Sequence, residues 1–136
     1  MNFLLDANAW IGHLRQTTPT VTRRLSQHPP SDVALCSIVL AELLYGAERS
    51  HASYRAANFA LVAGLRQQYV SLPFDDPAAE EYGRIRSHLA NQGTPIGPND
   101  LIIAAIALAN KLTLVSHNTA EFSRVPGLAL EDWQVP

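Results

Sequence analysis

The chain has 136 residues, of which 47% are hydrophobic, and a formal net charge of −2. This length supports one domain with a substantial core and excludes two domains of ordinary size, so we expect a single domain over residues 1–136. The slightly negative charge excludes a protein that binds nucleic acid through a generally basic surface, and any such contact would need a local basic patch.

The first half of the chain predicts two strands and four helices. Residues 2–5 are mostly apolar and predict a short buried strand, and the next helix carries Trp10, Ile11 and Leu14 at helical spacing. Pro19 suits a first helical position, so a second helix is expected from there. The remaining elements are a strand over 32–37 and helices over 38–50 and 53–68.

The second half continues this alternation. It predicts a strand over 69–74, a helix from 76 to about 93, a helix begun by Pro98, a buried strand over 112–116 and an edge strand over 128–133. Short apolar strands that alternate with helices favour an α/β fold with a mainly parallel sheet covered on both faces. Sites in such sheets form at the carboxyl ends of the strands, which is where Asp6 and residues 116–118 fall.

Three carboxylates stand at positions where a freely solvated side chain is unusual. Asp6 directly follows the first strand, and Glu42 shares a largely apolar helix face. Asp100 falls in the first turn of a helix that is apolar on nearly every side. Two of them have an ordinary explanation, since Glu42 can reach solvent from the rim of a core and Asp100 can act only as a favourable charge at a helix start. Together they suggest three acids that meet at the strand ends.

Such a cluster predicts a bound cation, because carboxylates repel one another unless a positive charge lies between them. Oxygen ligands with room for water suit Mg²⁺, with Mn²⁺ as the alternative. The five histidines are scattered and show no zinc-binding spacing. No glycine-rich phosphate loop and no nucleophile elbow is present.

Three stretches in order, "LLDANAWI", "IVLAELLYGAERS" and "GTPIGPNDLIIAAIALANKLTLVSHNTAEFSRVPGLALEDW", resemble the PIN-domain ribonucleases, and most closely the VapC toxins of bacterial toxin–antitoxin modules. The resemblance implies one PIN-like domain with a central parallel sheet of about five strands flanked by helices. It implies a metal-dependent endoribonuclease, the toxin of a type II module, that hydrolyses RNA phosphodiester bonds and inhibits translation and growth. It also implies a cognate antitoxin and a homodimer.

The resemblance assigns roles to the residues at matching positions. Asp6, Glu42 and Asp100 match the catalytic acids of the family, with Asp6 and Asp100 as ligands of Mg²⁺. Glu42 would bind the metal through water or position the attacking water. Asn8 matches a polar residue that helps to orient the first acid, and Ser116 matches a hydroxyl position at the end of the fourth strand.

The chain departs from the family pattern at two positions. Ala7 stands where the family commonly has threonine, so a hydroxyl group is absent there. Asn118 stands where many relatives carry a fourth acid, and it can offer a carbonyl oxygen but no charge. Glu121 could partly substitute for that acid. Whether one or two metal ions bind is therefore open.

Arginine dominates the basic residues, with nine arginines against the single Lys111. Arginine suits bidentate contacts to phosphate, although a GC-rich genome produces the same bias. The candidate RNA contacts are Arg15, Arg23, Arg24, Arg84, Arg86 and Arg124.

Two other classes of function compete with a nuclease. A phosphotransfer domain of the receiver or phosphatase type also has an aspartate after its first strand, but it needs a lysine near the site, usually after a late strand. Lys111 precedes the predicted strand over 112–116 instead. A non-catalytic interaction domain would explain the many apolar residues of the helices over 38–67.

The sequence also predicts a compartment. Cys36 is the single cysteine, so an internal disulfide is impossible and a reducing cytoplasm fits. No stretch reaches the roughly 18 apolar residues of a membrane span, and no secretion signal is recognisable. We expect a cytoplasmic protein that does not insert into a membrane.

Overall fold

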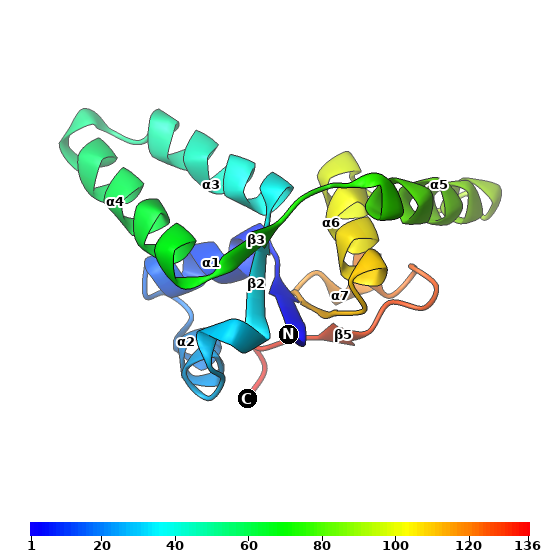
Figure 1. The fold of residues 1–136 in the computed structure, drawn as a ribbon, viewed down its shortest axis with the longest axis horizontal. Helices are drawn as coiled ribbons and strands as arrows, with labels where there is room; N and C mark the ends of the chain where they lie inside the picture. Colours follow the sequence, from blue (N-terminus) through cyan, green and yellow to red (C-terminus); the bar gives the residue numbers. More distant parts are fainter.

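A computed structural model describes residues 1–136, and its centre is one sheet of five parallel strands in the order β3-β2-β1-β4-β5 (Figure 1). The strands are β1 (Phe3–Leu5), β2 (Val33–Cys36), β3 (Val70–Leu72), β4 (Thr113–Val115) and β5 (Leu130–Glu131). The helices are α1 (Ala7–Leu14), α2 (Pro19–Ser26), α3 (Ser37–Arg49), α4 (Ala52–Gln68), α5 (Asp76–Asn91), α6 (Pro98–Ala109) and α7 (Thr119–Phe122), with a 3₁₀ turn η1 (Pro30–Asp32). The predicted α/β class and the number of strands are confirmed.

Strand β1 lies at the centre of the sheet and pairs with β2 on one side and β4 on the other. Leu4 lies opposite both Ala34 and Leu114, and all three are fully buried. Burial on both faces is what an all-parallel sheet requires, because helices cover each side. All five strands run in one direction, so the carboxyl ends of β1 and β4 meet at the same edge.

Two elements differ from the sequence prediction at the rims of the sheet. The edge strand expected over 69–74 is limited to Val70–Leu72, and the one expected over 128–133 to Leu130–Glu131. Short edge strands limit pairing with other chains. Helix α7, with only four residues, carries too little periodicity to be recognised in the sequence.

One hydrophobic core includes buried residues of the sheet and of all seven helices. Helix α6 buries Ile103 and Ile106 together with three alanines, whose small side chains let the helix approach its neighbours closely. Cys36 is fully buried, and this burial raises the pKa of its thiol to about 11, so the residue packs as an apolar side chain. None of the helices is both long and apolar enough to cross a membrane.

Two helical hairpins extend from the sheet in different directions (Figure 1). Helices α3 and α4 pack together and project from one side, and α5 and α6 pack together on the other. The two ends of the chain lie near each other, where the Trp133 ring contacts Phe3 with 5.1 Å between centroids. The carboxyl edge of the sheet is therefore flanked by both hairpins.

We expect Leu114→Ala to lower the free energy of unfolding by about 2–5 kcal/mol, because it leaves a cavity in the central layer of the core. Leu114 is fully buried, whereas Leu61 is 45% exposed. Leu61→Ala is thus the matched control and should cost much less. Chemical denaturation of both variants measures the difference, and equal losses would contradict this account of the core.

Candidate active site

Asp6 is a buried carboxylate with two hydrogen-bond donors. It follows β1 directly and is the N-cap of α1, where its Oδ1 accepts from the Ala9 N–H at 2.9 Å. Its Oδ2 accepts from Ser116 Oγ at 2.6 Å. Despite these bonds, burial raises the pKa of Asp6, with a further contribution from the charge of Glu42. The structure therefore holds this charge at a cost.

Ser116 connects the strand ends. It follows β4, is 1% exposed, and besides donating to Asp6 it accepts from the Asn118 N–H at 3.0 Å. The backbone repeats the link, because the Asp6 N–H donates to the Val115 carbonyl at 3.1 Å. The predicted meeting of Asp6 and Ser116 at one edge of the sheet is confirmed.

Asp100 lies in the first turn of α6, next to two other polar side chains. Asn118 Nδ2 donates to Asp100 Oδ2 at 3.4 Å and to Glu121 Oε2 at 2.6 Å. Glu121 Oε1 accepts from the Gly97 N–H at 2.6 Å, immediately before α6. Helix α7 thus contacts the segment that begins α6. Glu121 bonds directly to Gly97 and Asn118, although the sequence indicated it only as a partial substitute for a fourth acid.

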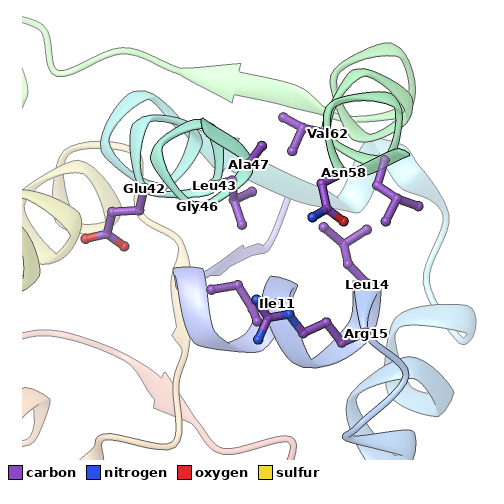
Figure 2. Close-up of a pocket in the computed structure, with 10 residues that line it drawn as sticks. Ile11, Leu14, Arg15, Glu42, Leu43, Gly46, Ala47, Asn58 and Val62 are labelled. Carbon is purple, nitrogen blue, oxygen red and sulfur yellow. The ribbon is translucent and has the colours of Figure 1, made fainter. Parts of the chain in front are cut away.

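Glu42 is half-buried on α3. Figure 2 shows its carboxylate pointing away from the apolar groove between α1, α3 and α4, of which the residue forms one end. Asn99 of α6 donates to Glu42 Oε1 at 2.8 Å. Asn99 immediately precedes Asp100, so this bond brings α3 to the same turn of α6.

The three predicted acids interact electrostatically. Burial, Glu121 and the charges of Asp6 and Glu42 together raise the pKa of Asp100 to about 6. The Gly97 N–H is the main reason why the pKa of Glu121 is lowered. The site is therefore a set of carboxylates, of which Asp6 and Asp100 are destabilised in their charged forms.

The donor set fits a hard divalent cation bound through water. In this geometry no three His, Cys, Asp or Glu side chains are grouped closely enough to hold one metal ion directly. Mg²⁺ is usually bound by one or two carboxylates and keeps several waters, so it does not need three direct ligands. Burial and neighbouring acids raise the pKa values of Asp6 and Asp100, and a cation beside these two side chains would offset part of that cost.

The other predicted site residues, Asn8 and the arginines, differ from one another in their contacts. Asn8 is exposed, and its side chain makes no hydrogen bond to Asp6, which is oriented by Ser116 and the Ala9 N–H instead. Among the candidate RNA contacts, Arg24 pairs with Glu131 and Arg84 with Glu81. No carboxylate lies within 4.0 Å of the side-chain nitrogens of the remaining four, Arg15, Arg23, Arg86 and Arg124.

Lys111 lies at the opposite edge of the sheet from the acids. It precedes β4, whereas Asp6 follows the parallel neighbour β1. A receiver or phosphatase site needs its lysine beside the aspartate, so the structure does not favour that alternative.

Known proteins resemble the chain over nearly its full length. A family model of the PIN domain matches residues 3–128. The tRNA(fMet)-specific endonuclease VapC of Salmonella typhimurium is 39% identical over 133 residues, and ribonuclease VapC2 of Haemophilus influenzae is 35% identical, each alignment covering 98% of both chains.

Solved structures agree in fold. The chain superposes on the crystal structure of DNA-bound VapBC from Salmonella typhimurium with a TM-score of 0.90 and 38% identity, covering 98% of both chains. For VapBC2 from Rickettsia felis, bound to a DNA fragment of its promoter, the TM-score is 0.87 at 31% identity, covering 98% of this chain and 99% of the other.

We expect Asp100→Asn to raise the melting temperature in chelator more at about pH 8 than at about pH 5. The pKa of Asp100 is about 6 against an ordinary 3.8, so the folded protein holds an unfavourable charge above pH 6. That cost disappears as the pH falls toward 4, because the folded protein then binds a proton that the unfolded chain does not yet bind. The asparagine variant lacks this charge at every pH.

Asp76→Asn is the matched control, since Asp76 also lies in the first turn of a helix but is exposed and is not among the groups that raise the pKa of Asp100. Melts of wild type and both variants at the two pH values measure the effect. An equal shift for Asp100→Asn at both would show that its neighbours do not raise its pKa.

Proposed function

Because the chain belongs to the PIN-domain family, and within it to the VapC ribonucleases, we propose that it is a metal-dependent endoribonuclease and the toxin of a type II toxin–antitoxin module. The observation that carries the proposal is the convergence of Asp6, Glu42 and Asp100 from β1, α3 and α6 at one edge of the sheet. The proposal places its action in the cytoplasm, where it would inhibit translation and growth by cleaving RNA.

The proposed cofactor is Mg²⁺, with Mn²⁺ as the alternative, held by Asp6 and Asp100. When bound, the ion polarises the phosphate and lowers the pKa of water. Ser116 and the Ala9 N–H fix the orientation of the Asp6 carboxylate. Glu42, held by Asn99, is the carboxylate that orients the attacking water and accepts its proton.

The names of two relatives support a proposal for the substrate. Two of them, from Salmonella typhimurium and Shigella flexneri, are named tRNA(fMet)-specific endonucleases and are 39% and 38% identical to this chain. We therefore propose tRNA(fMet) as the first RNA to test.

The proposed partners are a cognate antitoxin and a second copy of the chain. Structures of relatives are toxin–antitoxin complexes. An apolar groove lined by Ile11, Leu14 and Leu43 ends at Glu42 and carries Arg15 (Figure 2). An antitoxin segment in this groove would lie beside the acids, and a cationic side chain on it would take the place of the metal charge. Such a complex should be inactive.

We expect Asp6→Asn, Glu42→Gln and Asp100→Asn each to abolish cleavage of tRNA(fMet) while leaving the protein folded, because each removes one of the converging charges. Incubation of purified protein with the tRNA, with Mg²⁺ or with chelator, measures cleavage, and circular dichroism checks the fold. Glu48→Gln on the exposed end of α3 is the control. Near-normal activity in any two of the three acid variants would place the active site elsewhere.

We expect millimolar Mg²⁺ to raise the melting temperature of wild type, because a ligand that binds only the folded state stabilises it. Asp6→Asn should lose most of this rise and melt at or above wild type in chelator, since it removes a buried charge. Differential scanning calorimetry in the two buffers tests both statements. A lower melt in chelator with an unchanged Mg²⁺ effect would identify Asp6 as a structural helix cap only.

A further inference from the structure

A second groove, of about 380 Å³, lies between α5 and the segment that leads into α6. Its lining includes Tyr82, Arg86 and Leu89 from α5, and Pro95, Ile96 and Pro98 from the following segment. We propose that this groove binds one unpaired base of the RNA next to the cleaved bond, with the base stacked on Tyr82 and contacted by Arg86. The inference rests on the proposed nuclease function and adds a specificity-determining site to it.

The two key side chains form a ready surface for a base. The Arg86 guanidinium lies 5.7 Å from the centroid of the Tyr82 ring, and its Nη1 donates to the Tyr82 hydroxyl at 3.0 Å. Phe74 meets the same ring edge-on at 5.9 Å, which fixes its orientation. Proteins recognise unpaired RNA bases by stacking them on aromatic rings and on arginine.

Charge favours RNA as the occupant. The groove has no acidic residue in its lining, and Arg86 has no carboxylate partner within 4.0 Å. Its other N–H groups are therefore free to donate to a base edge or a phosphate. The remaining lining is mainly apolar, and its volume lies within the range of small-molecule sites.

The groove also reaches the helix turn that carries Asp100. Pro98 lines it and begins α6, and Asp100 belongs to the same first turn. The acids repel RNA phosphates, so a substrate needs favourable contacts close to the bond that is cut. A base in this groove would supply such a contact and fix the position of the neighbouring phosphate.

The protein arm of the test compares wild type, Tyr82→Leu/Arg86→Gln and the control Tyr54→Leu/Arg49→Gln. The control removes the same two residue types from exposed positions on the α3–α4 hairpin. With tRNA(fMet) and Mg²⁺, we expect the groove variant to lower kcat/KM by about 5- to 150-fold, the range that one base–aromatic stack provides, and the control to stay near wild type. Melting temperatures check folding, and Arg86→Gln alone serves if the double variant unfolds.

The RNA arm does not depend on protein folding. Synthetic hairpins that span the mapped cleavage site carry an abasic ribose at one position at a time on either side of the cut bond. With wild-type protein, kcat/KM should fall by a similar factor when the abasic ribose stands at one particular position, and at no other position. The groove variant should lose nothing further there, because two changes that remove the same contact are not additive.

Four results would overturn the inference. A groove variant that cleaves like the control shows that no base binds there, and the nuclease function then stands without it. The loss of kcat/KM at the sensitive abasic position and the loss caused by the groove variant could also multiply when the two are combined. That result would show that they remove different contacts and that no base binds in the groove. A groove variant whose mass by light scattering falls from dimer to monomer shows that a second copy of the chain occupies the groove. If wild type cuts no RNA at all, the proposed function fails and the inference fails with it.

Discussion

The hydrogen bond from Ser116 Oγ to Asp6 Oδ2 joins two residues that are 110 positions apart, and the arrangement of the site depends on it. It forms because β1 and β4 are parallel neighbours whose carboxyl ends coincide. With Asp6 fixed at that point, α3 and α6 bring Glu42 and Asp100 to the same edge, where Asn99 joins the two helices. The order of the strands therefore determines which residues form the site, since another order would leave the same residues apart.

Assembly of these acids has an electrostatic cost that neighbouring donors only partly offset. The Ala9 N–H and Ser116 stabilise the charged form of Asp6, but burial outweighs them and its pKa is raised. Asn118 adds no charge to the site, and its amide donates to both Asp100 and Glu121. Glu121 restores a carboxylate three residues later, yet the Gly97 N–H stabilises its charge. Glu121 therefore remains one of the acids that raise the pKa of Asp100, together with Asp6 and Glu42.

Local patterns in the sequence predicted the fold well, and long-range contacts account for what they missed. Residues 2–5 and the apolar helix after Pro98 have strong periodicity, and both elements are confirmed. Helix α7 is one turn long, so its role depends on packing against α6. The three-residue spacing of Asn118 and Glu121 was the one available signal that they act together. The pairing of Arg24 with Glu131 crosses more than 100 positions and leaves no trace in local sequence.

Under the proposed nuclease function, the arginines that lack acidic partners are the groups that would offset the repulsion between RNA and the carboxylates. Phosphates approach such a site against repulsion, so cations must lie at its margins. Arg15 lies in the groove that ends at Glu42, and Arg86 lies in the groove that Pro98 shares with the turn of Asp100. Each groove therefore carries one arginine and includes part of an element that holds one of the acids. In this arrangement an antitoxin segment bound beside Glu42 would cover Arg15 and leave the groove of Arg86 open. Inhibition would then depend on neutralising the acids themselves, because RNA would retain a second place to bind.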